Sequence, residues 1–291
     1  MIKKPVLSYM GLGLMGLPMA KHLLSQGYVI HGYDINSSSL EKAQTLGVVT
    51  HPDPQSAALA GEIILLNLPT VYAVKDVVWG DKGVAKVMQV PQCIVDFSTN
   101  PVSQGRSFIQ ALFQETGCAW IDAPVSGGPI AAGNGTLTVM AGGHAEDFSR
   151  VENILRDVSS QLTLVGPPGS GLVAKTLNQL VVGCLHAVIA ESAVLAENAG
   201  IEAACIPKAL SGGHADGVLF QQLFPRMLAK DFSPRGYARQ LLKDLDMVQD
   251  FAAELKMPTP MTAQAQTLYR MLVHKGHSEL DTSAIVKVFD R

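Results

Sequence analysis

The sequence is poor in charged residues, which make up 16% of its 291 positions against roughly 25% in a typical soluble protein. A two-domain monomer of this length needs more charge to cover its surface. The deficit therefore predicts that some surface is buried against another copy of the chain, in a homodimer or homotetramer. A basic excess is also absent. The formal net charge of −3 offers no basic field to nucleic acid or to an anionic membrane.

Clustered cysteines and long apolar runs are missing as well. The cysteines are Cys93, Cys118, Cys184 and Cys205. Their wide spacing predicts reduced thiols in a cytoplasmic protein, and the dispersed histidines give no reason to expect a metal. No run reaches the 18 or so apolar residues of a membrane span. The apolar stretch from Val6 to Ala20 is interrupted by glycines and a proline, which argues against a signal peptide.

The first 165 residues alternate short β-like runs with helical patterns, which predicts a mostly parallel sheet with helices on both faces. We expect strands at residues 6–9, 29–33, 63–66, 94–97, 119–122, 136–140 and 162–165. The expected helices include residues 14–26, 38–46, 103–116 and 146–159. The run from Ile63 to Leu66 is continuously apolar, as in a parallel strand buried on both faces.

A cluster of turn-forming residues from Gly166 to Gly171 divides the chain. A nearly all-apolar helical stretch follows at 172–199, which Gly200 is expected to end and which should lie inside a structure. The pattern beyond it stays helical. We therefore predict an α/β nucleotide-binding domain at 1–166, a long interdomain helix, and an all-α domain at 167–291 that serves substrate binding and oligomerisation.

A glycine motif follows the first expected strand and precedes a helical pattern. Its residues are Gly11, Leu12, Gly13, Leu14, Met15 and Gly16. Gly11 permits a tight turn, Gly13 lets the backbone approach a diphosphate, and Gly16 lets the helix pack on the strand. Because a helix N-terminus favours anions, the motif predicts a Rossmann-type domain that binds a dinucleotide there.

An acidic residue, Asp34, ends the second expected strand 23 residues after Gly11. A carboxylate there accepts hydrogen bonds from the ribose hydroxyls of NAD and repels the 2′-phosphate of NADP. No arginine follows closely, so NAD is favoured over NADP. The competing interpretation makes Asp34 an ordinary loop or helix-capping residue.

Two further sets of residues suggest a substrate site. Ser126, Gly127 and Gly128 follow a strand and expose N–H groups and a hydroxyl suited to a carboxylate, although an ordinary glycine-rich turn has the same composition. Lys175 and Asn178 lie three residues apart and so share one face of the long helix. A buried lysine is suited to proton transfer, but a lysine in the first helical turns can equally extend to solvent.

Motifs spread over nearly the whole chain resemble the β-hydroxyacid dehydrogenase family. They are GLGLMGLPMA at 11–20, DAPVSGG at 122–128, GTLT at 135–138, SGLVAKTLNQ at 170–179 and LKDL at 242–245. The resemblance implies a reversible NAD-dependent hydride transfer between the nicotinamide and a small 3-hydroxy acid or its semialdehyde. The alternatives are an NADP-dependent semialdehyde or glyoxylate reductase of the same family, and a non-catalytic dinucleotide-binding relative.

The resemblance also implies roles for particular residues. Lys175 matches the catalytic lysine and Asn178 the asparagine beside it, while Ser126, Gly127 and Gly128 match the loop that binds the substrate carboxylate. Residues matched to the cofactor and the nicotinamide end of the site are Leu68, Pro69, Thr99 and Lys243. Thr99 is also matched to the substrate.

The chain departs from the family pattern at three positions. Asn67 replaces a more usual methionine, and Gly236 and Gln240 stand where a phenylalanine and a leucine are common. If that phenylalanine helps to close the pocket, this chain has a roomier or more polar one. The substrate itself stays open among hydroxyisobutyrate, tartronate semialdehyde (2-hydroxy-3-oxopropionate), glycerate, threonate, serine and 4-hydroxybutyrate.

Overall fold

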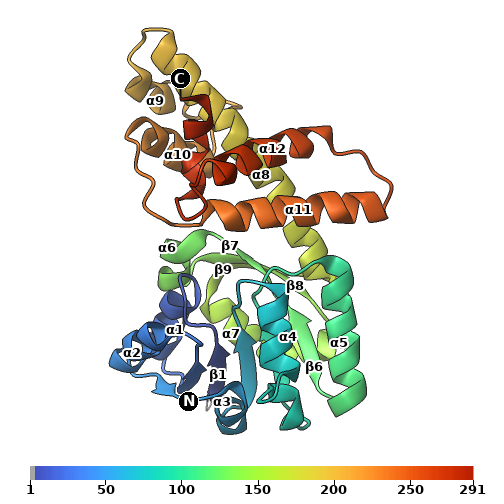
Figure 1. The fold of residues 1–291 in the computed structure, drawn as a ribbon. Coiled ribbons are helices and arrows are strands. Elements are labelled where there is room, and N and C mark those ends of the chain that lie inside the picture. The colour runs from blue at the N-terminus through green and yellow to red at the C-terminus, as the bar shows by residue number, and fades with distance from the viewer. Residues whose placement is uncertain (1–3, 291) are drawn as a thin grey trace. The chain divides into compact units, whose positions relative to one another are not determined.

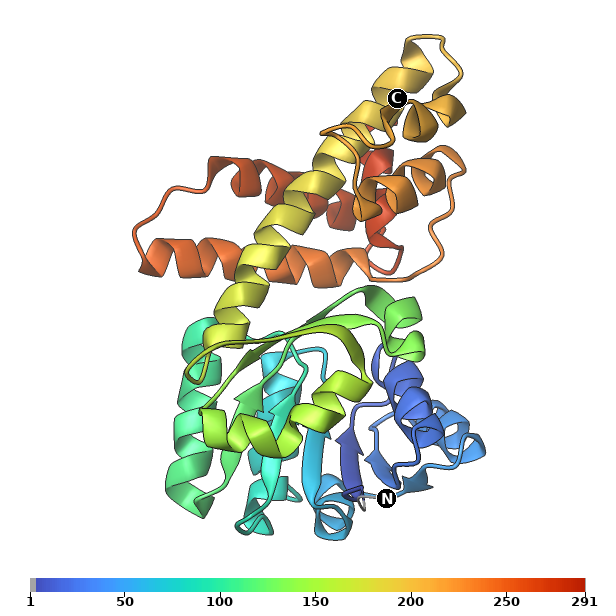
Figure 2. The same cartoon turned by 180° about the vertical axis from the view of Figure 1, so that it is seen from behind.

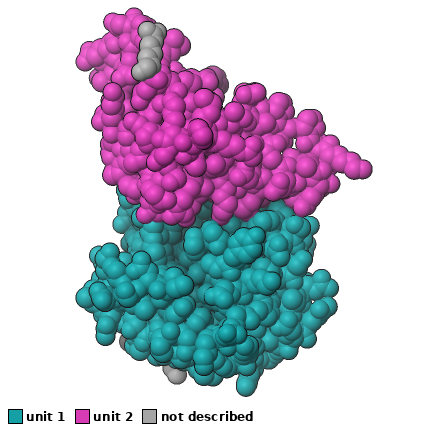
Figure 3. All heavy atoms as spheres, viewed as in Figure 1, with its two compact units in different colours: residues 1–175 teal, residues 176–291 magenta. Residues whose placement is uncertain are grey.

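The computed structural model of the chain describes residues 4–290. The chain divides into two compact units, residues 1–175 and 176–291, which Figure 3 shows in teal and magenta. The division falls inside one long helix, α8 (Ser170–Asn198), so that the helix begins in the first unit and continues into the second.

The first unit is built on one sheet (Figures 1 and 2), and within residues 4–290 its strand order is β3-β2-β1-β4-β5-β6-β8-β7, with β9 paired to β8. The strands are β1 (Leu7–Met10), β2 (Ile30–Tyr33), β3 (Val49–Thr50), β4 (Ile63–Leu66), β5 (Cys93–Asp96), β6 (Ala119–Asp122), β7 (Val125–Ser126), β8 (Leu137–Gly142) and β9 (Ser159–Gly166). Pairing is parallel from β3 through β6, whereas β8 runs antiparallel to β6 and β7. The parallel order brings the carboxyl ends of β1, β2, β4 and β5 to one edge of the sheet.

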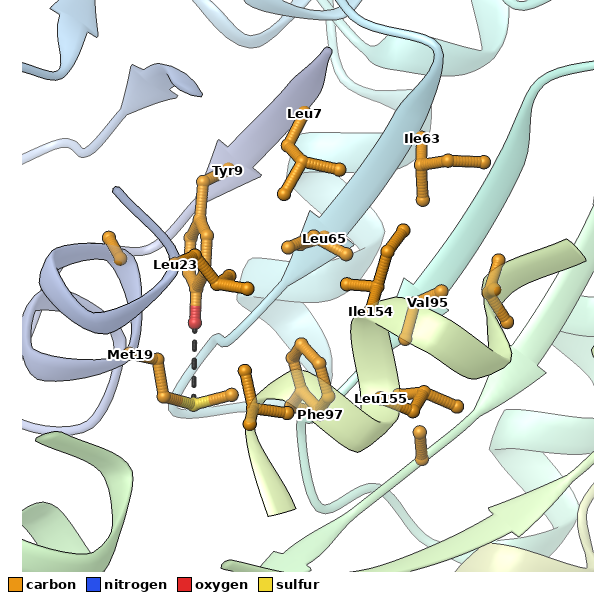
Figure 4. Close-up of a cluster of buried hydrophobic side chains, with 14 of the residues drawn as sticks. Leu7, Tyr9, Met19, Leu23, Ile63, Leu65, Val95, Phe97, Ile154 and Leu155 are labelled. Carbon is orange, nitrogen blue, oxygen red and sulfur yellow. Dashed lines mark hydrogen bonds between the residues drawn. The ribbon is translucent and has the colours of Figure 1, made fainter. Parts of the chain in front are cut away.

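Helices cover both faces of this sheet. They are α1 (Gly16–Ser25), α2 (Ser37–Thr45), α3 (Pro54–Ala60), α4 (Val71–Trp79), α5 (Val102–Thr116), α6 (Gly128–Asn134) and α7 (Ala145–Asp157), with a 3₁₀ turn at Val84–Lys86. Alternate strand residues point to opposite faces. Accordingly, Leu65 packs in a core with side chains of α1 and α7 (Figure 4), whereas Leu66 packs in another with side chains of α3, α4 and α5.

The second unit is helical. Besides most of α8 it contains α9 (Ile206–Leu210), α10 (Val218–Leu228), α11 (Ala238–Glu254) and α12 (Pro260–His274), with 3₁₀ segments at Ala203–Cys205 and Thr282–Phe289. Its core gathers buried side chains from these segments, among them Ala190, Phe224, Leu245, Tyr269 and Ile285. The predicted fold class, a Rossmann-type α/β domain followed by a long helix and an all-α domain, is confirmed.

The differences from the sequence prediction lie in short elements. Strands β3 and β7 and helices α3 and α6 were not predicted, because two to seven residues give too little periodicity. Helix α7 ends at Asp157, before the predicted 159, and β9 starts at Ser159, where pairing with β8 replaces the helical pattern. The long helix runs over Ser170–Asn198 rather than 172–199.

The expectation that the long helix lies inside the structure is wrong for this single chain. Five apolar side chains of α8, Leu177, Val181, Leu185, Val188 and Leu195, are 42% to 71% exposed. Among residues 4–290, α8 is the one helix long and apolar enough to cross a membrane, although 44% of its most apolar 18-residue segment is buried in the chain. The core helix of a soluble protein can have the same length and apolar composition.

Candidate active site

The glycine turn between β1 and α1 is fixed by the protein at both ends and open in its middle. Gly11 has a φ of 96°, and a Cβ there would collide with the carbonyl oxygen of Asn67. A Cβ at Gly16 would collide with the carbonyl oxygen of Gly11. Gly13 has no described atom within 4 Å of such a Cβ, so the space beside its backbone can admit a ligand. This geometry fits a dinucleotide diphosphate.

Asp34 is joined to the glycine turn. The N–H of Leu12 donates to its Oδ2 at 2.6 Å, and the N–H of Asn36 donates to its Oδ1 at 2.8 Å. These bonds hold the carboxylate at the end of β2 and beside the turn. Each oxygen retains a second lone pair that can accept a hydroxyl. Asp34 therefore links the glycine turn to the end of β2, the two elements that would hold a cofactor.

The turns after β4 and β5 form a second joined set. Leu68 donates its N–H to Ser98 Oγ at 2.9 Å. Asp96 in turn accepts the N–H of Ser98 at 2.8 Å and Nδ2 of Asn100 at 3.0 Å. Burial raises the pKa of Asp96 to about 7, against the lowering effect of these hydrogen bonds. The network holds Thr99, which lies between Ser98 and Asn100, on the turn adjacent to Leu68 and Pro69.

Asn67, which departs from the family pattern, faces the protein interior. Its Nδ2 lies 3.3 Å from Tyr9 Oη and 3.4 Å from Met19 Sδ. Its amide therefore supports the packing of α1 on β1.

The loop at Ser126–Gly128 adopts a conformation that requires glycine. Ser126 pairs with Thr138 of β8, and Gly127 and Gly128 then take φ values of 129° and 73°. Both angles are strained for residues with a side chain. A Cβ at Gly127 would lie 2.8 Å from Ala131 Cβ, whereas a Cβ at Gly128 would meet no described atom within 4 Å, so the loop is open beside Gly128.

Lys175 lies beside this loop. Its Nζ donates to the carbonyl oxygen of Val125 at 2.8 Å, and the residue is only 8% exposed. The geometry contradicts the interpretation in which Lys175 extends to solvent. Because Val125 precedes Ser126 directly, the structure brings together the predicted catalytic lysine and the predicted carboxylate loop.

Asp122 has a role that sequence reasoning missed. Its carboxylate accepts the N–H groups of Gly169 at 2.7 Å and Leu172 at 2.9 Å, and so fixes the start of α8, the helix that carries Lys175. Cβ atoms at Gly142 and Gly171 would lie 2.6 Å and 2.9 Å from its oxygens, so both glycines make room for the carboxylate. An aspartate at the buried end of an apolar strand was the available signal.

The two predicted site residues of the second unit are joined through neighbours. Asn178 donates from Nδ2 to Gln179 Oε1 at 2.8 Å, and Gln179 donates from Nε2 to Asp244 Oδ2 at 2.6 Å. The ammonium of Lys243 lies 3.2 Å from Asp244 Oδ1. Gln179 belongs to the SGLVAKTLNQ motif, but nothing in the sequence alone indicates its contact with Asp244.

The described part of the chain contains no cluster of three or more histidine, cysteine or acidic residues placed to hold a metal ion. What it does contain is a parallel sheet, a glycine turn before a helix, and an acidic residue at the end of the second strand. Together they define a dinucleotide-binding protein of the Rossmann class.

Family models identify the group within that class. Residues 6–166 match the NAD binding domain of 6-phosphogluconate dehydrogenase. Residues 169–289 match a model described as NAD-binding of NADP-dependent 3-hydroxyisobutyrate dehydrogenase.

Relatives that match nearly the whole chain support the same group as the family models. A 2-hydroxy-3-oxopropionate reductase of Escherichia coli (strain K12) is 32% identical over 98% of this chain and 97% of its own. An NAD-dependent L-serine dehydrogenase of Pseudomonas aeruginosa is 30% identical over 98% of this chain and 97% of its own. A crystal structure of a 3-hydroxyisobutyrate dehydrogenase from Salmonella typhimurium superimposes with a TM-score of 0.90 at 27% identity. The match covers 98% of this chain and 100% of that one. The chain belongs to the β-hydroxyacid dehydrogenase family and is an NAD(P)-binding oxidoreductase.

Proposed function

We propose that this enzyme catalyses reversible hydride transfer between NAD and a small 3-hydroxy acid or its semialdehyde, with Lys175 as general acid and base. The observation that carries the proposal is the buried Lys175 Nζ, held 2.8 Å from Val125 O at the start of the Ser126–Gly128 loop. A non-catalytic relative would have no use for a buried lysine at this place.

Most of the residues that would hold the cofactor belong to the first unit. Gly11 to Gly16 would hold the diphosphate, Asp34 would accept the ribose hydroxyls, and Leu68, Pro69 and Thr99 would contact the nicotinamide end of the cofactor. Lys243 is assigned to the cofactor by family resemblance. When bound, the nicotinamide supplies or accepts the hydride. We favour NAD because Asp34 is fixed beside the glycine turn, and a carboxylate there repels a 2′-phosphate.

The substrate is positioned by its carboxylate. Ser126 Oγ and the N–H groups of Gly127 and Gly128 bind the carboxylate, with Thr99 also contacting the substrate. Lys175 Nζ then takes the hydroxyl proton during oxidation and returns it during reduction. Asn178, one helical turn further along α8, orients the reacting hydroxyl. We assign dinucleotide binding mainly to residues 1–166, whereas residues 167–291 contribute Lys175 and Asn178 to the substrate site and serve oligomerisation.

A substrate panel tests the proposal. The purified protein is offered hydroxyisobutyrate, glycerate, threonate, serine, 4-hydroxybutyrate and 2,3-dihydroxypropane-1-sulfonate, and the carbonyl compounds that each would form on oxidation, each with NAD and NADP. Absorbance of the reduced nicotinamide reports turnover. We expect at least one 3-hydroxy acid to be oxidised with NAD preferred. Binding of NAD without turnover of any substrate would instead favour the non-catalytic alternative, and a strong NADP preference would overturn the role given to Asp34.

Gly236 bears on substrate size. A Cβ built there would have only Thr282 Cγ2, at 3.8 Å, within 4 Å among described atoms, so the position has room for a side chain. We propose that this position and Gln240 leave the substrate pocket wider or more polar than in relatives with phenylalanine and leucine. Gly236→Phe should then raise KM most for the bulkiest accepted substrates; unchanged kinetics across the panel would contradict this.

The exposed face of α8 supports a homo-oligomer, either a dimer or a tetramer. Leu177, Val181, Leu185 and Val188 follow one another at helical spacing and form an apolar stripe. A second copy that covers the stripe would explain the low charge content and make α8 the core helix of a cytoplasmic protein. Light scattering after size exclusion measures the assembly, and Leu177→Glu should dissociate it if the stripe is the interface.

A further inference from the structure

His186 of α8 is a buried histidine that the proposed mechanism does not use. It is 4% exposed, and its Nδ1 lies 2.8 Å from the carbonyl oxygen of Val182. Because a carbonyl oxygen only accepts hydrogen bonds, Nδ1 carries the proton. Burial lowers the pKa of the imidazole and so favours the neutral ring, in which Nε2 is an acceptor. Nε2 lies 3.0 Å from Thr282 Oγ1, so the hydroxyl of Thr282 donates to His186.

Thr282 is also held by its backbone. Its N–H donates to Gly236 O at 2.9 Å, and its carbonyl oxygen accepts Tyr269 Oη at 2.8 Å. The hydroxyl and the methyl group of a threonine occupy staggered positions on one Cβ, so the bond to His186 also fixes the direction of the methyl group. That methyl carbon is the one described atom within 4 Å of a Cβ built at Gly236. The methyl group, and not the hydroxyl, therefore faces the space beside Gly236.

We propose that Thr282 is a specificity-determining residue that presents its methyl group to the substrate beside Gly236, and that His186 is the positioning residue that holds it there. The inference rests on the function proposed above, in which Gly236 borders the substrate pocket. It makes this side of the pocket wide but apolar. A substrate hydroxyl placed against the methyl group loses water without gaining a partner, so a substrate methyl group is favoured at this place. His186 itself touches neither substrate nor cofactor.

Two acids of the panel form a matched pair for the test. Hydroxyisobutyrate and glycerate are both oxidised at carbon 3 and differ at carbon 2, where the first has a methyl group and the second a hydroxyl. The measured quantity is the ratio of kcat/KM for hydroxyisobutyrate to kcat/KM for glycerate. An apolar pocket distinguishes a methyl group from a hydroxyl by up to about 10²-fold, which sets the scale of the expected changes.

His186→Phe keeps an aromatic ring but removes the acceptor of the Thr282 hydroxyl. Thr282 can then turn its hydroxyl towards Gly236, and the ratio should fall by about threefold or more. Thr282→Ser keeps the hydroxyl that bonds to His186 but has no methyl group, so the ratio should fall in this variant even if His186→Phe does not fold. His274→Phe, at an exposed position at the end of α12, is the matched control and should leave the ratio unchanged.

A rescue experiment separates positioning from a merely structural role. In Thr282→Val a methyl group replaces the hydroxyl, so an apolar group faces Gly236 in either orientation and the ratio should stay within about twofold of the wild type. The melting temperature should nevertheless fall, because the buried Nε2 of His186 loses its partner. Combining Thr282→Val with His186→Phe should bring the ratio back to within about twofold of the wild type. If His186 only stabilised the fold, the second substitution would not restore the ratio.

Nitrogen-15 NMR of protein labelled at histidine tests the geometry without a substrate. The signals of His186 are identified by their loss in His186→Phe. At pH 7 they should show a neutral ring protonated at Nδ1, and the Nε2 signal should shift in Thr282→Val. A charged ring, or a proton on Nε2, would overturn the arrangement on which the positioning role depends.

The outcomes distinguish this inference from the function on which it rests. If the wild type oxidises hydroxyisobutyrate and His186→Phe leaves the ratio unchanged, or if Thr282→Val does not restore it, only the positioning role is overturned. If the wild type oxidises other acids of the panel but not hydroxyisobutyrate, the apolar contact at Thr282 is overturned. If it turns over no hydroxy acid, the proposed function fails and this inference falls with it. A lowered ratio in His186→Phe that Thr282→Val restores supports both.

Discussion

In the first unit the buried carboxylates of Asp96 and Asp122 are met by backbone N–H groups and an amide, whereas in the second unit the buried Asp281 is met by the guanidinium of Arg226 at 2.9 Å. The consequences for ionisation are opposite. Burial raises the pKa of Asp96 and of Asp122 above its usual range, because their hydrogen bonds only partly compensate. Burial also opposes ionisation of Asp281, but N–H groups of Ser283 and Arg235 together with Arg226 hold its pKa below the usual value.

This contrast separates two uses of buried polar groups. Asp96 and Asp122 hold the turns and the helix start that carry Thr99 and Lys175, and their ionised forms are disfavoured by the fold. Asp281 joins α10 to the loop before α11, since it also accepts the N–H groups of Arg235 and Gly236. Breaking the contacts of Asp96 or Asp122 should therefore change activity most. Breaking the contacts of Asp281 should change stability most.

The largest effect is expected at Lys175 itself. Lys175→Ala removes the group that exchanges the hydroxyl proton, and a positioned acid or base typically contributes about 10²–10⁴ in rate. We expect kcat to fall by at least about that factor, while NAD affinity, measured by calorimetry, stays close to that of the wild type. Turnover at the wild-type rate would remove the proposed mechanism.

Arg226→Met should give the largest loss of stability. It leaves the buried Asp281 without its charged partner, and breaking a buried ion pair in this way costs about 3–5 kcal/mol. The free energy of unfolding in urea measures the loss. Arg239→Met is the matched control because its pair with Glu279 is exposed, and such pairs contribute less than about 1 kcal/mol. Equal losses in the two variants would contradict the comparison.

Asp122→Asn should lower kcat by more than its loss of folding stability alone would explain. An asparagine accepts one of the N–H groups of Gly169 and Leu172 but turns its NH₂ towards the other, at a cost of about 1–3 kcal/mol. Because these bonds fix the start of α8, we expect kcat to fall as Lys175 moves relative to Val125. Asp53→Asn, which changes the cap of α3, is the control and should leave kcat unaltered.

The smallest effect is a pH dependence. The folded pKa of Asp96, about 7, lies above the ordinary aspartate value of 3.8, so its protonated form contributes stability that is complete below about pH 4 and is lost as the pH rises through 7. The melting temperature of Asp96→Asn should therefore fall less than that of the wild type from about pH 5 to about pH 8. Parallel profiles would show that Asp96 does not titrate in this range.

Much of the fold followed from local patterns. The alternation of apolar strands with helices, the glycine motif and the break at Gly166–Gly171 were sufficient to predict the sheet, the long helix and the helical second unit. Elements as short as β7 and α6 escaped because they depend on pairing with β8 and on glycines at positive φ, which leave no periodic signal.

The sequence by itself determined the family, the dinucleotide-binding turn and the identity of the candidate catalytic residues, because each depends on residue types at fixed spacing. Only the tertiary structure decided that Lys175 is buried against Val125 rather than extended to solvent, and that Asp122 fixes the helix carrying it. It also joined Asn178 to Lys243 through Gln179 and Asp244. The physical reason is that burial and hydrogen-bond geometry arise between segments distant in the chain, and no local pattern records which of them meet.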